Sequence, residues 1–534
     1  MHHLKTLRLV LGILVGATTC IVFFDSHSLI PESFKERITS AQFMPAVMSV
    51  LGGASLAAAT CASILALTAL IGRIYCSILC PLGLLQDAIA RLVALGRKIC
   101  GNRLRLPYEP PRQILRQALL IATILALVFG WKAFIVSWLD PYSQFGRIMG
   151  SIFRLPVTFA NNLLSTFFPN AVPRISVPWV SFGALLPPLF IFSAIAILSA
   201  LRGRLYCNLI CPVGSLLGWI SSRALVRIAI DKTSCVRCGD CQRVCKAQCI
   251  NLKTQEVDMS RCVSCFNCVA ICDEHGILPS LLGKAKARGK LSPKPRPATT
   301  LTTANSSSTP GSKIILSRRS FLTSTGTAAA ASTLAWLGHD KTLNTASAIA
   351  PPGAQSRARF VEHCTACQLC VSACPEHVLE PATTQYGQLT GFMKPHMNFN
   401  RSFCNINCTV CCDICPDDAL LPITLDTKKK TRLGIASVDL TRCLVRTDDF
   451  ACGACAEHCP TAALQFVKGP ARFNEPQINQ EHCIGCGACQ FACPVKGKAI
   501  RIRALEIHEM ADELQQEDAK DPNADKSAAG EFPF

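Results

Sequence analysis

Residues 483–494 read CIGCGACQFACP, and this spacing of four cysteines recurs along the chain and decides its fold. The pattern occurs four times in regular form and twice with a longer first gap, so that six runs use 24 of the 33 cysteines. In bacterial two-cluster proteins, three thiolates of such a run hold one 4Fe-4S cluster and the fourth holds the neighbouring cluster. The chain is therefore predicted to carry six 4Fe-4S clusters in α+β modules of the bacterial ferredoxin-like kind.

The predicted cluster ligands fall into six runs. They are Cys235, Cys238, Cys241 and Cys245; Cys262, Cys265, Cys268 and Cys272; Cys364, Cys367, Cys370 and Cys374; Cys404, Cys408, Cys411 and Cys415; Cys443, Cys452, Cys455 and Cys459; and Cys483, Cys486, Cys489 and Cys493. In the first two runs, Cys272 is expected to complete the site of run one and Cys245 that of run two. Runs three to six pair either in tandem, three with four and five with six, or nested, three with six and four with five. Spacing alone leaves both pairings open.

Zinc sites and disulfides are the other common uses of many cysteines. Structural zinc is usually bound by two separated cysteine pairs rather than by a run of four. Disulfide frameworks are typical of short secreted chains, whereas this chain has 534 residues. Six copies of one spacing therefore favour iron–sulfur clusters. Alternating stretches between the runs, at 463–467 and 499–503, predict the small strands of ferredoxin modules.

The first part of the chain contains four long apolar windows, near 7–24, 44–71, 114–134 and 180–201. A membrane-spanning helix needs roughly 20 such residues. The stretches after the second and fourth windows are rich in arginine, and the positive-inside rule then places both ends of this four-helix unit in the cytoplasm. No histidine lies within the windows and no Cys-x-x-Cys-His motif occurs, so we predict no haem.

Two copies of one motif follow the second and fourth windows, GRIYCSILCPLG at 72–83 and GRLYCNLICPVG at 203–214. The two Cys-x3-Cys-Pro pairs that they carry are Cys76 with Cys80 and Cys207 with Cys211. If the two halves are related by pseudo-symmetry, these four thiols converge. They then hold a further cluster or metal, or they cycle as redox thiols. The third alternative is that they are packing cysteines of a repeated turn.

A twin-arginine segment, SRRSFL at 317–322, separates the first two runs from the last four. With the weakly apolar stretch that follows, it matches the export signal of the twin-arginine kind. We expect this segment to anchor the chain as a fifth helix or to be cleaved after Ala348. The formal net charge is +19. No basic stripe with interleaved aromatic residues is present, so no nucleic-acid partner is predicted.

These features divide the chain into six predicted segments. They are a four-helix membrane domain at 1–225, a cytoplasmic two-cluster module at 226–280, a disordered basic linker at 281–313, a twin-arginine signal or anchor at 314–350, a four-cluster periplasmic domain at 351–505 and an acidic disordered tail at 506–534. The predicted fold class is an α-helical membrane domain joined to α+β ferredoxin-like modules. We expect a multi-pass protein of the bacterial inner membrane, with residues 226–313 cytoplasmic and residues 351–534 periplasmic.

Two family resemblances follow from these motifs. Residues 1–280 resemble NapH-type membrane ferredoxins, and residues 314–500 resemble NapG-type and MauM-type periplasmic ferredoxins, so the chain looks like a fusion of two usual partners. The resemblance implies an electron-transfer component of a quinol dehydrogenase, with a bound quinone, that passes electrons from the quinol pool to a periplasmic reductase or cytochrome of the nitrate reductase kind. The alternative is a redox maturation or repair factor for a periplasmic metalloenzyme, in which the Cys-x3-Cys-Pro thiols do the work.

Overall fold

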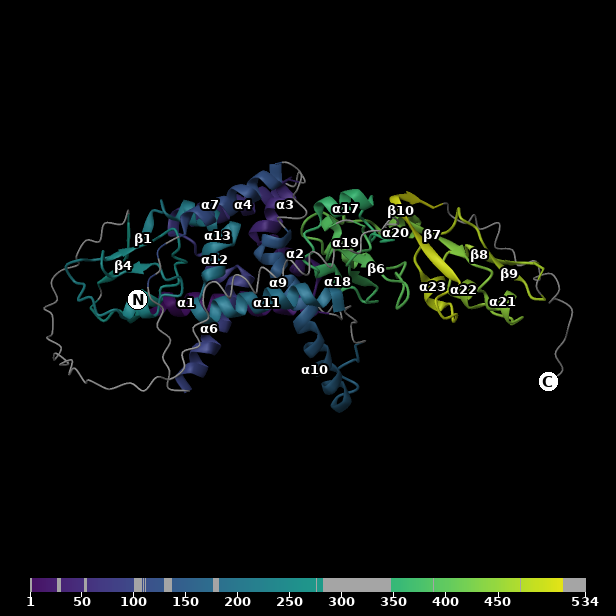
Figure 1. Cartoon of the computed structure of the whole chain (residues 1–534), viewed down its shortest axis with the longest axis horizontal. Helices are drawn as coiled ribbons and strands as arrows, with labels where there is room; N and C mark the ends of the chain where they lie inside the picture. The colour runs from purple at the N-terminus through teal and green to yellow at the C-terminus, as the bar shows by residue number, and fades with distance from the viewer. Residues whose placement is uncertain are drawn as a thin grey trace, which may run out of the picture. The chain divides into compact units, whose positions relative to one another are not determined.

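The computed structural model describes residues 2–25, 30–51, 55–99, 108, 110, 112–128, 137–175, 182–274, 276–281, 347–387, 389–470 and 472–511. All of these residues belong to one compact unit. Figure 1 shows the chain coloured from its N-terminus to its C-terminus. Most of the predicted basic linker, the twin-arginine motif with the expected fifth helix, and most of the acidic tail lie outside the described residues, whereas residues 347–350 of the predicted anchor segment are described.

The part of the chain before residue 225 is built from helices (Figure 1). They are α1 (His2–Phe24), α2 (Glu32–Ser40), α3 (Phe43–Leu51), α4 (Ser55–Ile71), α5 (Tyr75–Ile78), α6 (Pro81–Ile99), α7 (Gln113–Val128), α9 (Pro141–Ile148), the π-helix η1 (Met149–Phe153), α10 (Arg154–Phe167), α11 (Phe182–Arg202), α12 (Leu205–Leu209) and α13 (Pro212–Ser221). The short helices α5 and α12 occupy matching places in the two motif copies, and each is followed by a helix that begins at the motif's proline.

Two of these helices are long and apolar enough to cross a membrane, α1 over His3–Phe24 and α11 over Phe182–Arg202. The second window contains two helices, α3 and α4, and the described part of the third window contains α7; α4 and α7 are apolar but shorter. The described helices therefore provide two candidate spans where the sequence predicted four. Large apolar side chains of the two long helices are exposed, among them Ile13 of α1 and Phe190 of α11, as expected for helices in contact with lipid.

The segment between the third and fourth windows, for which the sequence analysis predicted no helix, contains α9, η1 and α10. Asp140 caps α9, since its carboxylate accepts hydrogen bonds from the backbone N–H groups of Tyr142, at 3.1 Å, and Ser143, at 2.7 Å. Such a cap satisfies donors that the first helical turn leaves free. Helices α9, η1 and α10 follow one another without a break and form the platform described below.

The ferredoxin modules combine short helices with two-stranded antiparallel sheets. The first module contains β1 (Val226–Ile230), β2 (Ile250–Asn251), β3 (Glu256–Val257), β4 (Ile277–Leu281), α14 (Asp240–Arg243) and α15 (Asn267–Ile271). Its first and last strands pair with each other, as do β2 and β3. The pairing of β1 with β4 closes the module at its two ends.

The second ferredoxin part begins after residue 346. Its elements are α17 (Arg357–His363), α18 (Leu369–Ala373), β5 (Leu379–Pro381), η3 (Leu389–Gly391), β6 (Pro395–Met397), α19 (Val410–Asp413), α20 (Leu425–Lys430), β7 (Thr431–Val438), α21 (Leu444–Thr447), α22 (Ala454–Glu457), β8 (Leu464–Val467), β9 (Glu475–Ile478), α23 (Ala488–Ala492) and β10 (Ile500–Met510). Strand pairs are β5 with β6, β7 with β10, and β8 with β9. The strands predicted at 463–467 and 499–503 are confirmed as β8 and the first half of β10.

The acidic tail begins later than predicted. Strand β10 continues to Met510, and Ala511 is buried. The carboxylate of Glu509 lies 3.2 Å from the guanidinium of Arg432 on β7. Residues 506–511, assigned from their acidic composition to a disordered tail, are therefore part of the fold, because sheet pairing outweighs local composition.

Candidate iron-sulfur sites

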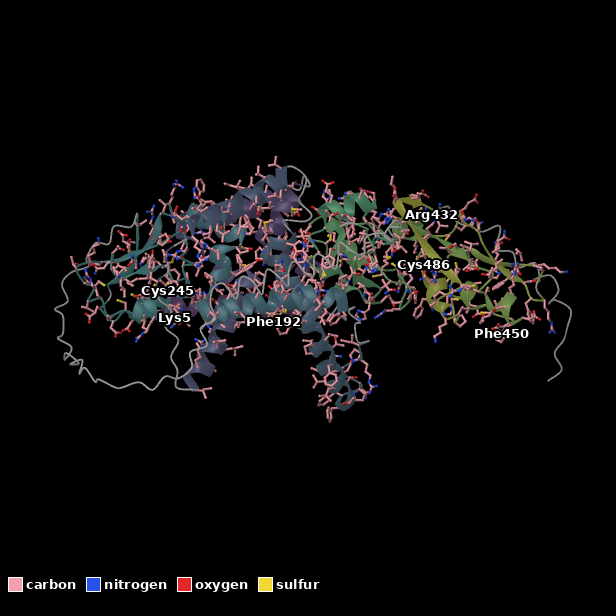
Figure 2. All side chains as sticks on the ribbon, viewed as in Figure 1. Lys5, Phe192, Cys245, Arg432, Phe450 and Cys486 are labelled. Atoms are coloured by element: carbon pink, nitrogen blue, oxygen red, sulfur yellow. The ribbon has the colours of Figure 1, made fainter. Side chains whose placement is uncertain are left out.

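The first two runs are brought together by the packing of α14 against α15. One cavity is lined by Cys262, Cys265, Cys268 and Cys245, and also by Cys249, which belongs to neither run. The other set consists of Cys235, Cys238, Cys241 and Cys272. Burial, followed by the thiols of the other three cysteines, raises the pKa of Cys241 to about 11. Each set thus takes three cysteines from one run and the last cysteine of the other, which is the crossed arrangement of two-cluster proteins. Figure 2 labels Cys245 in this module and Cys486 in the part that carries β7 and β10.

Runs five and six pair with each other, which decides between the two arrangements left open by the sequence. One cavity is lined by Cys459, Cys483, Cys486 and Cys489. A second cavity is lined by Cys443, Cys452, Cys455 and Cys493. The stretched run five, with its long first gap after Cys443, therefore forms the same kind of crossed pair as the regular runs.

Runs three and four form the remaining pair, on the packed helices α18 and α19. Burial, followed by Cys411 and Cys404 of run four, raises the pKa of Cys374 to about 12. Burial, with Asp417 and then Cys364 of run three, raises the pKa of Cys415 to about 12. The last cysteine of each run therefore faces the other run, so the pairing of runs three to six is tandem.

Within the described ranges, His, Cys, Asp and Glu side chains form no group of three or more that is arranged for a single metal ion. Backbone N–H groups also point at ligand sulfurs, from Ala366 to Cys364, from Leu420 to Cys415 and from Ala499 to Cys493, each at 3.4 Å. Hydrogen bonds to cysteine sulfurs are a means by which proteins tune iron–sulfur clusters, which supply one-electron carriers when bound.

A buried lysine contacts the run-four set. Lys428 Nζ donates to Cys404 Sγ at 3.0 Å and to the backbone oxygens of Asn405 and Cys408, both at 3.3 Å. Its side chain is buried, whereas the neighbouring Lys429 is exposed. A positive charge at a ligand sulfur favours the reduced, more negative state of a bound cluster.

We expect Lys428→Met to lower the reduction potential of one cluster by roughly 60 mV, which is a tenfold change for a one-electron couple. The loss of the buried charge beside Cys404 is the physical reason. The measurement is a redox titration followed by electron paramagnetic resonance (EPR). Lys429→Met, on the exposed side of the same helix, is the control and should leave every potential in place. Equal behaviour of the two variants would contradict this role of Lys428.

The two Cys-x3-Cys-Pro motifs pack against each other in a reciprocal way. Arg73 Nη2 of the first copy lies 3.5 Å from the Cys207 carbonyl oxygen of the second, and Arg204 Nη1 of the second donates to the Cys76 carbonyl oxygen of the first at 2.6 Å. Both arginines are buried, at 0% and 1% exposed. The sequence analysis counted them only among the arginines that follow the second and fourth windows, although both occupy the second position of the repeated motif.

The four cysteines of these motifs are brought together inside the helical domain. They are 3–4% exposed, and they are Cys76, Cys80, Cys207 and Cys211. Burial, then Cys207, Cys80 and Cys76 in turn, raises the pKa of Cys211 well above its ordinary value. The thiols of the two motif copies thus lie within electrostatic reach of one another.

The first ferredoxin module rests on these motifs. The Arg204 backbone N–H donates to the Lys246 carbonyl oxygen at 3.0 Å, and Asn208 Nδ2 donates to the Ala247 carbonyl oxygen at 3.2 Å. A Cβ atom at Gly203, which has a φ of +66°, would fall onto the Lys246 carbonyl oxygen. Glycine is thus required here both by the backbone and by the close approach of the module.

The second ferredoxin part rests on the α9–α10 platform. Arg147 donates from Nε to the Ala366 carbonyl oxygen at 3.2 Å and from Nη2 to the Thr365 carbonyl oxygen at 3.1 Å. Arg154 Nη1 donates to the Val371 carbonyl oxygen at 2.9 Å. These bonds fix the backbone of run three, from Thr365 to Val371, on helices of the first part of the chain. The sequence analysis did not predict this contact, because the acceptors lie more than 200 positions away along the chain.

A partly open cavity lies between α1, α6 and α9. Its volume is about 320 Å³. The walls are mainly apolar, with Gly12, Gly16 and Leu84 among the lining residues, while Arg8, Asp87 and Arg91 supply charge. Pro81, which directly follows Cys80, is also part of the lining. Apolar walls with a few polar groups are typical of small-molecule sites.

Asp87 joins this cavity to the first ferredoxin module. Its Oδ2 accepts from Arg8 Nη2 at 2.7 Å and from Lys246 Nζ at 2.8 Å, and its Oδ1 accepts from Arg204 Nε at 2.8 Å. Burial alone would raise the pKa of Asp87, but Arg204, Lys246 and Arg8 hold it well below its usual range. The carboxylate is therefore a permanent anion that ties α1, the second motif copy and the module together. Sequence reasoning missed this residue.

Comparisons with known proteins bear on both parts of the chain. A family model described as a 4Fe-4S dicluster domain matches residues 450–496, and one described as a 4Fe-4S binding domain matches twice, at 55–102 and 184–231. The double match covers the two Cys-x3-Cys-Pro copies. No solved structure matches the chain.

Several curated proteins are similar to it. The ferredoxin-type protein NapF of Escherichia coli K12 is 27% identical over 160 residues, which is 30% of this chain and 87% of NapF. The methylamine utilization ferredoxin-type protein MauM of Methylorubrum extorquens is 30% identical over 202 residues, 36% of this chain and 90% of MauM. The ferredoxin-type protein NapG of E. coli K12 is 28% identical over 167 residues, 29% of this chain and 71% of NapG.

Proposed function

The chain belongs to the MauM family of ferredoxin-type proteins, and from this premise we propose that it takes electrons from membrane quinol and delivers them to a periplasmic reductase or cytochrome. Its coarser role, iron–sulfur electron transfer, follows from the ferredoxin-type relatives and the 4Fe-4S family models. The finer proposal rests on one observation, the apolar cavity between α1, α6 and α9 that reaches the first Cys-x3-Cys-Pro motif.

The lining of this cavity suits a quinol. A quinol has an apolar tail and a flat ring with two hydroxyl groups, so it needs apolar walls and a few polar partners. The guanidinium groups of Arg8 and Arg91 can donate hydrogen bonds to a ring oxygen, and the small residues Gly12 and Gly16 leave room beside Leu84. Asp87 is already bonded to three cations, so it serves to position Arg8 rather than to accept a proton.

The contacts of α1 support a location of the two ferredoxin parts on opposite sides of the membrane. Arg8, near the start of α1, shares Asp87 with Lys246 of the first module. Phe23, near its end, packs against Phe145 on the platform that holds run three, with ring centroids 5.7 Å apart. A helix of 23 residues is about 35 Å long, and the apolar core of a bilayer is about 30 Å thick.

The remaining parts of the proposal come from the resemblance to NapH-type and NapG-type proteins. We take α4 and α7 as two further spans of a four-helix membrane unit, the segment at 317–322 as an export signal, and the last four clusters as periplasmic. The acceptor would be an enzyme of the nitrate reductase kind. The name of MauM refers to methylamine utilization, so an acceptor in a different pathway is equally compatible with the family.

The test of the proposal introduces a larger side chain from α1 into the cavity. We expect Gly16→Leu to slow reduction of the clusters by quinol roughly tenfold or more, since overpacking a site costs about 1–3 kcal/mol. A Cβ atom at Gly16 would lie 3.4 Å from Leu84 Cδ1, so a longer side chain enters the cavity. Reduction is followed by absorbance after addition of a soluble quinol to the full chain in detergent.

The control is Gly96→Leu, because a Cβ atom at Gly96 of α6 would meet nothing within 4 Å. This variant should be reduced by quinol at the normal rate, and both variants should be reduced fully by dithionite. Unchanged quinol reduction in Gly16→Leu would rule out this cavity, and wild-type protein that no quinol reduces would rule out the proposed function.

The alternative of a maturation or repair factor requires thiols that a partner protein can reach. The Cys-x3-Cys-Pro cysteines are 3–4% exposed and lie beneath the first ferredoxin module. Their burial favours the electron-transfer proposal. Deleting the gene separates the two functions, because a maturation factor leaves its partner enzyme without metal, whereas a dehydrogenase leaves the partner loaded but unreduced.

A further inference from the structure

The four motif cysteines have no role in the proposal above, although they share one buried place in the helical domain. Each motif copy brings two thiols, and an iron–sulfur cluster is held by four. Neither copy can therefore form such a site alone, even though the same family model matches both. The reciprocal bonds from Arg73 to the Cys207 carbonyl and from Arg204 to the Cys76 carbonyl hold the two pairs together.

Arg73 brings a fully buried positive charge to this place. Its partners are the Asn208 side chain, at 3.1 Å, the carbonyl oxygens of Ser260 and Cys207, at 3.2 and 3.5 Å, and Cys76 Sγ, at 3.9 Å. None of the described acidic side chains pairs with it, although Arg73 is fully buried. Burying a charge without a counter-charge costs free energy, so an anion is expected beside Arg73.

Two donors at the same place also have no acceptor. Arg73 Nε and Gln86 Nε2 are both buried and unpaired in the part of the chain that the structure describes. The other end of the Gln86 amide accepts from Cys207 Sγ at 3.5 Å, so this side chain stands directly beside the cysteine set. Buried donors without partners are rare in proteins and commonly mark a bound group. Thiolate and sulfide sulfurs are acceptors of the required charge.

We propose that Cys76, Cys80, Cys207 and Cys211 together hold one iron–sulfur cluster, with two ligands from each motif copy, inside the helical domain. Thiolate sets of this kind select iron–sulfur clusters, zinc or Cu(I). The Gly214 N–H also donates to Cys211 Sγ at 3.4 Å, as backbone amides do at the ferredoxin sets. This inference is independent of quinol binding, since it concerns what the thiols hold.

The decisive experiment removes the two pairs separately and together. The full chain is produced without oxygen and purified in detergent, and iron, acid-labile sulfide and the EPR spectrum of the reduced protein are measured. Cys76→Ser with Cys80→Ser, and Cys207→Ser with Cys211→Ser, should each lose the same EPR component and roughly two to four iron atoms per chain. The variant that lacks all four cysteines should lose no more than either pair does. Cys20→Ser, in helix α1, is the control and should keep all iron.

Three results would overturn the proposal. They are full iron content in both pair variants, twice the loss in the variant that lacks all four cysteines, and loss of zinc instead of iron. If the pair variants do not accumulate, Gln86→Leu decides, because it keeps all four cysteines and removes the unpaired donor. This variant should keep its iron and shift the potential of one EPR component. An unchanged spectrum and unchanged potentials in Gln86→Leu would then count against the cluster.

Discussion

Replacing Asp87 with asparagine is expected to lower the free energy of unfolding by about 3–5 kcal/mol, because it leaves buried cations without their shared counter-charge. The carboxylate is bonded to Arg8, Arg204 and Lys246, and the side chains of the first two are 4% and 1% exposed. Denaturant unfolding in detergent, followed by circular dichroism, measures the change. The same variant should weaken the contact of the first ferredoxin module, since Lys246 belongs to it.

The matched control is Glu506→Gln, which breaks an ion pair at the surface. Its partner is Arg357, at 2.9 Å, and the Glu506 side chain is 85% exposed. Pairs of this kind contribute less than about 1 kcal/mol, so the control should unfold almost as the wild type does. Equal free energies of unfolding in the two variants would show that the ion pairs of Asp87 do not stabilise the fold.

The pH dependence of the Asp87 effect follows from its pKa. A carboxyl whose pKa is lower in the folded chain adds stability above its unfolded pKa, near 4, and loses it only as the pH falls through the folded value. That folded value lies well below the usual range. The difference between the wild type and Asp87→Asn should therefore be constant from pH 6 to pH 8. A difference that shrinks within this interval would contradict the assigned charge state.

Serine substitutions at the ends of runs five and six are expected to remove clusters in a crossed pattern. Cys459→Ser should abolish the same EPR component as Cys483→Ser, although these residues belong to different runs, because both line one cavity. Cys493→Ser should instead share its effect with Cys443→Ser. Each substitution removes one of four ligands, so a loss of up to roughly four iron atoms per chain is expected.

The comparison of these four variants tests the tandem pairing directly. In a nested arrangement, Cys459 would affect a site of run four, and Cys459→Ser and Cys483→Ser would remove different components. Both arrangements predict the same loss of iron, so the EPR spectra must distinguish them. Cys412→Ser supplies a control, because Cys412 lies next to Cys411 and donates to the Pro352 carbonyl oxygen at 3.0 Å without belonging to any of the four-cysteine sets.

The cluster sets could be predicted from the sequence because their spacing is local. A run with gaps of two, two and three residues places three sulfurs on one turn of the chain, whatever surrounds it. The partner of each run was harder to predict, since it depends on which short helices pack together. The crossed sets of runs five and six appear only when α22 lies against α23.

The residues that hold the parts together were not predictable from local patterns. Arg147 and Arg154 stand in a segment of ordinary composition, and their acceptors are backbone oxygens more than 200 positions away. Arg73 and Arg204 were visible as repeat positions, but their cross-bonding requires the two copies to face each other. Apolar length predicted helices at all four windows, yet α4 and α7 are too short to be recognised as spans by length.

The platform formed by α9, η1 and α10 has a consequence for the order of assembly. Arg147 meets Ala366 across 219 positions, so the platform is synthesised long before the loop that covers it. Until that loop arrives, the face of the platform at Gly146, where a Cβ atom would meet the Cys367 carbonyl oxygen, stays open to proteases and to other chains. Contacts between such distant positions also form slowly. Substitutions that weaken the contact, on the platform or on the loop, should therefore reduce the amount of protein that accumulates in the cell. The molecules that do fold should keep normal reduction potentials.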